Sequence, residues 1–375
     1  MQIFRYNIRV ISASETPLLP TNFIHIISLF FTMENVERNS VIKTYQGGKL
    51  TMMDSSSIPA QVFFNHFEAI YRHIEKEIEM NQVTSLLSWK KFRPFMNDNR
   101  VNYIKAMLLN AWNTEFSLRG VAKAPESQFI NHSLHWTFPQ AYFSIFYSTR
   151  ALMGTQGIYT ADESVLAKRM ANWIEKGFYP ASLGYYSSGN YNDFKIHRLP
   201  KTDIQPSVDY LKDEEDVVSH VAQFLKTTRT LKAKKLREVI QSNEDTALKN
   251  KKTGDPILKF SKQDWEQITS QLPVTTVFDL LGRLKYSESN REIERYLNAN
   301  IAFDAFHESL IGIVYYINLV HEIYLVKALG IEAYKNLLNE LPVYLQNGFA
   351  HERFNQIIKP QLLTKAYHNK KQWAA

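Results

Sequence analysis

The stretch from Phe306 to Lys327, "FHESLIGIVYYINLVHEIYLVK", constrains the fold more than any other part of the sequence. Nine of the ten residues from 311 to 320 are Ile, Val, Tyr, Leu or Gly, and Asn318 is the exception. An apolar run of this length is shorter than the ~20 residues that a bilayer-spanning helix needs. A helix that is apolar all round is typical of a protein core. We therefore predict a buried core helix here rather than a membrane span.

Two His-Glu pairs flank this run, His307 with Glu308 and His321 with Glu322. At 1.5 Å per residue they lie about 21 Å apart along one helix, so they are not expected to share a single site. Asp304, His307 and Glu308 fall on one face of one turn. A metal would need further ligands from another helix, and neither HExxH nor Glu-x-x-His occurs. We favour a capping or core histidine, with metal ligation and catalysis as the alternatives.

Helical periodicity covers most of the chain after the first 54 residues. Apolar side chains recur every three or four residues over 55–80, 98–116, 135–157, 162–178, 217–241, 261–272, 275–289, 290–330, 331–347 and 352–368. The pattern predicts a mainly α protein, a multi-helix bundle in two helical lobes at 57–180 and 215–375. The Gly-, Ser-, Asn- and Pro-rich residues 181–214 are expected to form an irregular connection, with a short hairpin tip at "YYSSGNYND".

The first 56 residues are expected to be a separate segment, disordered in part. Within it, "TNFIHIISLFFTM" at 21–33 has the hydrophobicity of a signal peptide but no convincing cleavage site after it. A buried or amphipathic terminal segment, an upstream extension before Met33 and a secretion signal all remain open. Whether residues 1–32 belong to the mature protein is therefore left undecided.

Composition narrows the classes of function. The chain has no cysteine, which excludes disulfides, thiolate zinc sites and a cysteine nucleophile. Neither GxxxxGK[ST] nor GxGxxG nor GxSxG is present, so nucleotide hydrolysis of those types is not expected. We expect a folded cytoplasmic protein with no cofactor and no membrane contact.

The positive charge is concentrated in one segment. Residues 226–262 hold eleven Lys and Arg against four acidic residues, a net charge of +7 that equals that of the whole chain. The first part predicts an amphipathic helix with a cationic outer face, and a Lys-rich loop follows. Contact with a phosphate backbone and a merely solvated face are the two interpretations. The predicted nucleic-acid-binding residues are Arg229, Lys232, Lys234, Lys235, Arg237, Lys249, Lys251 and Lys252.

The stretch "QAYFSIFYSTRALMGTQG" at 140–157, with long helices after it, resembles the helical HEPN group (higher eukaryote and prokaryote nucleotide-binding domains). This resemblance implies a defence or toxin-type role. Ribonucleases of that group carry Arg or Asn, four to six residues and then His, which act on an RNA 2′-hydroxyl and phosphate without metal. No Arg-x(4–6)-His occurs here; Asn300 precedes His307 at this spacing, and Asn190 and Asn192 precede His197.

Two functional hypotheses follow from these observations. The first is an RNA- or DNA-associated helical protein, and a candidate metal-independent ribonuclease. Its catalytic residues would be His307 as general acid or base, Asn300 orienting the phosphate, and Glu308. The second is a non-enzymatic interaction or scaffold protein, whose aromatic-rich helices contact a protein partner or a second copy of the chain. A metal-dependent nuclease is a weaker third hypothesis.

Overall fold

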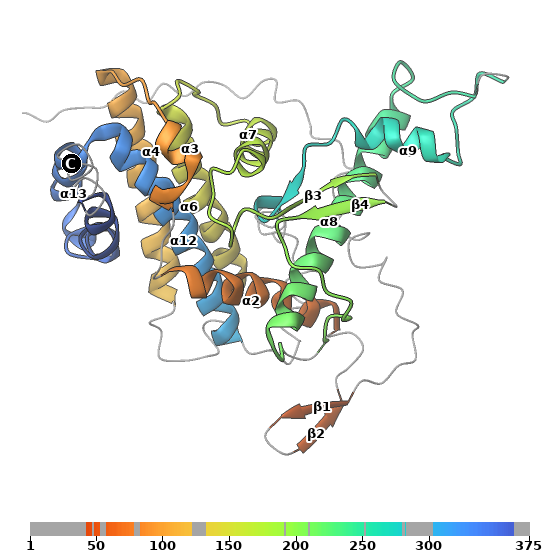
Figure 1. Cartoon of the computed structure of the whole chain (residues 1–375), viewed down its shortest axis with the longest axis horizontal. Helices are drawn as coiled ribbons and strands as arrows, with labels where there is room; N and C mark the ends of the chain where they lie inside the picture. Colours follow the sequence, from red (N-terminus) through yellow and green to blue (C-terminus); the bar gives the residue numbers. More distant parts are fainter. Residues whose placement is uncertain are drawn as a thin grey trace, which may run out of the picture. The chain divides into compact units, whose positions relative to one another are not determined.

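The computed structural model describes residues 43–46, 49–52, 58–78, 83–121, 133–190, 193–208, 211–250, 253–279, 282 and 303–363. This part of the chain is mainly helical, as predicted (Figure 1). The helices are α2 (Ile58–Ile78), α3 (Leu87–Lys91), α4 (Asp98–Val121), α6 (Leu134–Gly154), α7 (Glu163–Glu175), α8 (Glu214–Ser242), α9 (Lys262–Thr269), α12 (Phe303–Leu329), α13 (Ile331–Asn339) and α14 (Phe349–Glu352). Short 3₁₀ turns span Val83–Ser85 and Val343–Leu345, and a π-helical turn, Arg353–Ile358, continues directly from α14.

Two small antiparallel sheets accompany the helices. They are formed by β1 (Lys43–Gln46), β2 (Lys49–Met52), β3 (Tyr186–Gly189), β4 (Phe194–His197) and β5 (Thr275–Thr276). β1 pairs with β2, and β3 lies between β4 and β5 with Tyr186 opposite both His197 and Thr276. Strands β3 and β4 confirm the predicted hairpin. Strand β5 falls where a helix was predicted, which is wrong at 275–276, because this backbone pairs with β3.

Helix α12 lies at the centre of the fold and packs against α2, α4 and α6. Phe306 on α12 contacts Phe64 and Phe67 of α2 and Phe138 of α6, with ring centroids 4.2, 5.3 and 5.5 Å away. By length and composition α12 is the one described helix that could cross a membrane, but 83% of its apolar window is buried inside the fold. The prediction of a core helix is confirmed.

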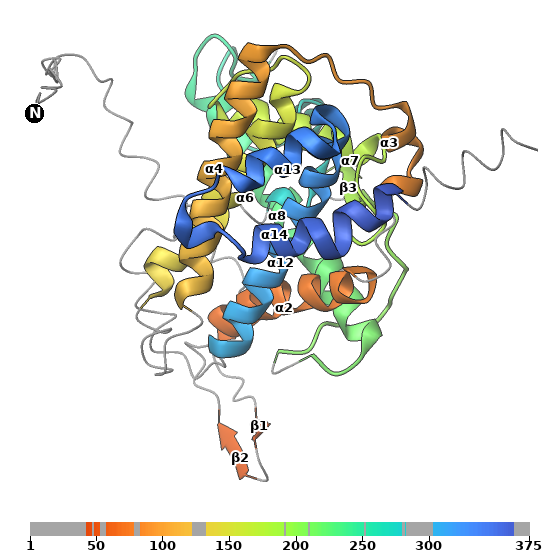
Figure 2. The ribbon, with the colours of Figure 1, turned by 90° about the vertical axis from the view of Figure 1, so that its left-hand side faces the viewer.

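The two predicted lobes do not form separate packing units. Residues 38–375 form one compact unit, because α12 from the second half of the chain is enclosed by α2, α4 and α6 from the first. Figure 2 shows α13 and α14 lying over α4 and α12. Surface contacts confirm this packing: Lys105 of α4 pairs with Glu340 at 3.2 Å, and the Tyr344 hydroxyl donates to Asn113 at 2.7 Å. Helix α12 is thus covered by helices from both halves of the chain, on either side of residues 181–214.

Candidate functional site

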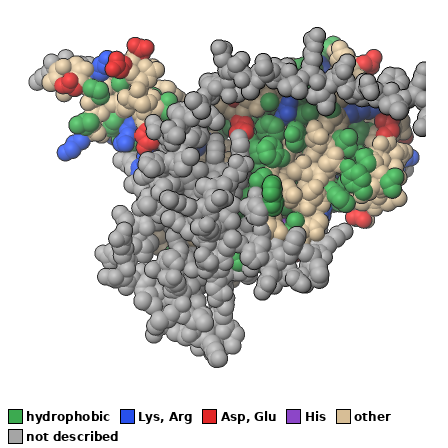
Figure 3. Space-filling view, turned by 180° about the vertical axis from the view of Figure 1, so that it is seen from behind, with side chains coloured by type: hydrophobic (Ala, Val, Ile, Leu, Met, Phe, Trp, Pro, Cys, Tyr) green, Lys and Arg blue, Asp and Glu red, His purple; other side chains and the backbone are tan. Residues whose placement is uncertain are grey.

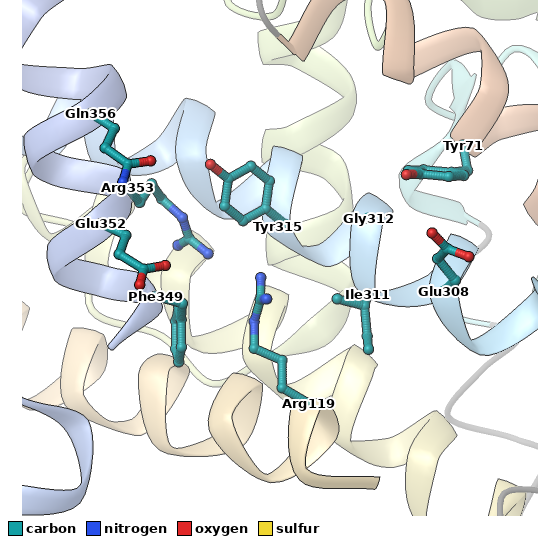
Figure 4. Close-up of a pocket in the computed structure, with 10 residues that line it drawn as sticks. All are labelled: Tyr71, Arg119, Glu308, Ile311, Gly312, Tyr315, Phe349, Glu352, Arg353 and Gln356. Atoms are coloured by element: carbon teal, nitrogen blue, oxygen red, sulfur yellow. The ribbon is translucent and has the colours of Figure 1, made fainter. Parts of the chain in front are cut away.

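A pocket of about 340 Å³ lies between α2, α4, α12 and the C-terminal turn (Figure 4). Tyr71 comes from α2, Arg119 from α4, Glu308 and Tyr315 from α12, and Arg353 from the π-helical turn. π-helical turns are rare and occur frequently at functional sites. The volume falls within the range of small-molecule sites, which lie between helices in many helical proteins. This pocket is therefore a candidate binding site.

The inner end of the pocket rests on a buried ion-pair network. The Arg353 guanidinium donates through Nη1 to Glu322 Oε1 at 2.5 Å and through Nη2 to Glu115 Oε1. Arg119 donates to the same Glu115 oxygen through Nε at 3.1 Å and Nη2 at 2.8 Å. The Trp112 indole donates to Glu322 Oε1 at 2.9 Å. Two arginines and two glutamates from α4, α12 and the C-terminal turn thus meet inside the fold.

Burial and neighbouring charges set the protonation of this network. Burial acts to raise the pKa of Glu115. Arg353, Arg119 and a hydrogen bond from Asn318 act to lower it and outweigh burial, so the pKa lies below its ordinary value. Burial also raises the pKa of Glu322, and there Arg353 does not offset it. Burial acts to lower the pKa of Arg353, yet the two carboxylates outweigh it and the guanidinium stays charged. Of the two carboxyls, Glu115 is the one that the arginines keep ionised, and Glu322 is the one whose protonation burial favours.

Two aromatic rings hold the arginines in place. The guanidinium carbon of Arg119 lies 5.5 Å from the Tyr315 ring centroid and 4.7 Å from that of Phe349. Arg353 lies 4.6 and 5.4 Å from the same two rings. Cation–π contacts of this kind fix the planes of the guanidinium groups. Arg353 Nε is buried without an acceptor among the described residues, and Arg119 Nη1 likewise has none there.

The outer end of the pocket is acidic and phenolic. Glu308 is exposed there, and Figure 4 shows its carboxylate beneath the Tyr71 side chain. Burial, Glu75 and Glu308 together raise the pKa of Tyr71, which keeps its hydroxyl protonated. The Tyr71 ring covers Gly312 so closely that a Cβ at that glycine would lie 2.1 Å from Tyr71 Cε2. The pocket thus has a guanidinium end and a carboxylate end.

The predicted catalytic residues are not brought together. His307 is 1% exposed and burial lowers its pKa, so the imidazole is neutral and shielded from any substrate in solvent. Asn300 lies outside the described residues. Glu308 alone lines the pocket. The burial of His307 does not support a role as general acid or base, because that chemistry needs hydrogen-bond reach to the reacting group, and this role stays a prediction.

In the second His-Glu pair, His321 belongs to the core and Glu322 lies behind the pocket. His321 is buried, with Ser148 Oγ 2.9 Å from Nδ1 and the Tyr179 hydroxyl 2.8 Å from Nε2. Burial lowers the pKa of His321 to about 3, so it is a neutral core group. Glu322 instead binds Arg353 behind the pocket. Glu308 lines the pocket, whereas Glu322 lies behind it and reaches it only through Arg353, so the two pairs do not share a single site.

The basic segment is turned inward along its first half. Arg229 is 3% exposed; its Nε donates to the Gly189 carbonyl at 2.9 Å and its Nη1 to the Pro273 carbonyl at 3.1 Å. Lys232 pairs with Asp279 at 2.7 Å. The prediction that Arg229 lies on the outer face is wrong, because its guanidinium satisfies acceptors around β3. Lys232, one of the predicted nucleic-acid-binding residues, is paired next to β5. Burial also lowers the pKa of half-buried Lys235, next to half-buried Lys234.

Farther along the segment, the described cations are half-buried or exposed. We call residues 226–250 and 253–270 the α8–α9 arm; Figure 1 shows α9 at the far end of α8 from α2. Arg237 lies over the Phe260 and Trp265 rings, at 5.5 and 5.7 Å. Lys249 is exposed, whereas Lys251 and Lys252 lie outside the described residues. Three more lysines of the predicted basic segment, which were not among the predicted binding residues, are exposed; they are Lys226, Lys259 and Lys262.

Among the described residues, no three His, Asp or Glu side chains converge as metal ligands would. Comparison of the chain with protein-family models, with curated proteins and with solved structures gives no match. The resemblance to the HEPN group therefore stays a prediction.

Proposed function

We propose that this chain is a nucleic-acid-associated helical protein that contacts phosphates through the α8–α9 arm. The observation that carries the proposal is the group of exposed lysines on the arm. In the described part of the chain, none of them has a carboxylate oxygen within 4.0 Å; these are Lys226, Lys249, Lys259 and Lys262. Unpaired surface cations gathered on one segment are the electrostatic footprint of polyanion binding.

Aromatic side chains on the arm support the same proposal. The Phe260 and Trp265 rings lie 5.6 Å apart, and the Arg237 guanidinium lies over both. Rings next to cations are the groups that bind single-stranded nucleic acid, since bases stack on the rings while the cations meet the backbone. Single-stranded RNA or DNA is therefore the favoured partner.

The proposal concerns binding and not cleavage. His307, the predicted acid or base, is buried, and the arm lies on other elements of the fold. Phosphate neutralisation releases counterions, so the logarithm of the binding constant falls linearly with the logarithm of salt concentration. For single strands the slope is about 0.7 per neutralised phosphate.

The test is fluorescence anisotropy of a labelled single-stranded RNA, titrated at several salt concentrations. Replacing Lys226, Lys249, Lys259 and Lys262 together by Gln is expected to lower the salt slope by about 2 to 3. A matched control removes four exposed lysines elsewhere, at Lys168, Lys176, Lys201 and Lys335. If the salt slope falls equally in the two variants, overall charge causes the effect, and the proposal that the α8–α9 arm binds RNA is rejected. An unchanged salt slope in the arm variant would also reject this proposal.

A second candidate function, an interaction protein, is favoured by exposed apolar groups. Phe116 and Tyr344 are 41% and 54% exposed with their rings 5.4 Å apart, and Val343 is 84% exposed. Figure 3 shows hydrophobic side chains gathered on the described surface seen from behind. Light scattering after size exclusion tests this candidate. An assembly that dissociates when Phe116 and Val343 are replaced by Ser, in a protein that binds no nucleic acid, would favour it over the first.

A further inference from the structure

The pocket between α2, α4, α12 and the C-terminal turn has two chemically different ends. At the inner end, Arg353 Nε and Arg119 Nη1 are donors without acceptors in the described structure, and the first of them is buried. A buried donor without a partner is rare in folded proteins. Both arginines line the pocket, but 27% of the Arg119 side chain is exposed and none of the Arg353 side chain, so an acceptor in the pocket meets Arg119 first. Guanidinium groups match the planar, two-oxygen geometry of a carboxylate.

The charge of the inner end also favours an anion. Arg119 and Arg353 face Glu115 and Glu322, but burial raises the pKa of Glu322 and thereby reduces the negative charge. An incoming carboxylate would restore the balance while Tyr315 and Phe349 keep both guanidinium planes fixed. A fixed receptor loses little conformational freedom on binding.

The outer end selects for the opposite charge. Glu308 is exposed, and none of the described cations lies within 4.0 Å of it. Glu352, also exposed, lines the pocket at the other end, beside Arg353 and Phe349 (Figure 4). At the outer end, the Glu308 carboxylate repels a polyphosphate or a dicarboxylate and attracts an ammonium group. Between the ends, Ile311 and the Tyr315 ring offer apolar surface.

We propose that this pocket binds a short peptide with free termini, its carboxylate on Arg119 and its ammonium group on Glu308. Glu308 and Tyr315 are seven residues apart on α12, which corresponds to about 10 Å along the helix axis. A residue of extended peptide spans roughly 3.3–3.6 Å, so a tripeptide bridges the two ends. A single amino acid is too short to reach both. This proposal is independent of nucleic-acid binding by the α8–α9 arm.

The experiment is calorimetric titration of the full chain with the tripeptide Ala-Leu-Ala and two blocked forms of it. Acetylation removes the ammonium group, and amidation removes the carboxylate, while the rest of the probe is unchanged. We expect the free tripeptide to bind and each blocked form to bind at least tenfold more weakly. Failure of the free tripeptide to bind, or equal binding of all three probes, would overturn the proposal. Binding of inorganic phosphate in place of the tripeptide would overturn it as well.

Variants locate the two ends of the probe. Glu308→Gln changes an exposed side chain, so the fold is expected to survive. In this variant the free and the acetylated tripeptide should bind equally, because the partner of the ammonium group is gone. Arg119→Gln should abolish the preference for the free carboxylate over the amide. Lys105→Gln, on the outer surface of α4, is the matched control and should bind like the native protein.

Thermal unfolding of each variant accompanies the titrations. If Arg119→Gln unfolds, Glu308→Gln and the blocked probes still decide the question. A Glu308→Gln protein that keeps the native preference for the free over the acetylated tripeptide contradicts the assignment of Glu308.

Discussion

Arg353 Nη1 lies 2.5 Å from Glu322 Oε1, with both side chains buried. The same guanidinium bonds Glu115 on α4, so one arginine joins the C-terminal turn to two central helices. Buried ion pairs add little net stability, but the loss of one partner leaves an uncompensated charge. The network therefore makes the fold sensitive to single substitutions at these positions.

The two glutamates of the network are expected to differ in their effect on stability. Glu115→Gln removes the ionised carboxylate that Arg353 and Arg119 share, so we expect a loss of about 3 to 5 kcal/mol in unfolding free energy. Glu322→Gln keeps an oxygen for Trp112 and Arg353, and burial already favours its neutral form. We expect a loss of about 1 kcal/mol there. Urea unfolding at neutral pH measures both, and equal losses would contradict this assignment of charge.

Stability is expected to fall in mild acid because of His321. Burial lowers its pKa to about 3 in the folded protein, whereas an unfolded histidine titrates near 6.5. Below pH 6.5 the unfolded chain therefore binds a proton that the folded chain refuses. The unfolding free energy should drop by about 1.4 kcal/mol per pH unit from this residue, until the folded pKa is reached.

Urea unfolding between pH 7 and pH 5 tests this pH dependence in the native protein and in His321→Gln. The variant should show a shallower slope. Some slope should remain, because burial also lowers the pKa values of His220 and His307. Identical slopes in the two proteins would show that His321 does not cause the effect.

Gly312→Ala is expected to push Tyr71 away from the pocket. The added Cβ would lie 2.1 Å from Tyr71 Cε2, so the ring must move. We expect a cost of about 1 to 3 kcal/mol, as for other overpacked positions. Combining Gly312→Ala with Tyr71→Ala should remove most of this cost, which a double-mutant cycle of unfolding free energies measures. Additive costs would contradict the contact.

Arg229→Leu should separate stability from nucleic-acid binding. The substitution leaves the carbonyls of Gly189 and Pro273 without their donor, and we expect a loss of about 2 to 3 kcal/mol in unfolding free energy. Lys259→Gln, on the exposed surface, should change the unfolding free energy by less than about 0.5 kcal/mol. Lys259→Gln should lower the salt slope of RNA binding, whereas Arg229→Leu should leave it unchanged. A lower salt slope in folded Arg229→Leu would show that this arginine reaches phosphate.

Periodicity was sufficient to predict the helices and the core. The apolar run around Asn318 correctly indicates a buried helix, and "YYSSGNYND" correctly indicates a hairpin. Both signals are local, since each depends on residues within a few turns of one another. The packing of α12 against α2, α4 and α6 could not be predicted, because contacts between distant helices leave no local signal.

The candidate pocket could not be predicted for the same reason. Arg353 and Glu115 are 238 residues apart in the sequence. One signal was available, because Glu308, Tyr315 and Glu322 recur at seven-residue intervals and so share a face of α12. The basic segment shows the converse problem. Arg229 lies four residues after Leu225, about one helical turn, and so shares its buried face. Charge alone does not tell an outward cation from an inward one.

The position of Arg353 also bears on the order in which this protein can fold during synthesis. Glu115 and Glu322 leave the ribosome before the arginine that both of them contact. While the C-terminal turn is undocked, Glu115 and Glu322 lack that guanidinium. A partly folded chain in this state is expected to keep an open, hydrated interior within reach of chaperones and proteases.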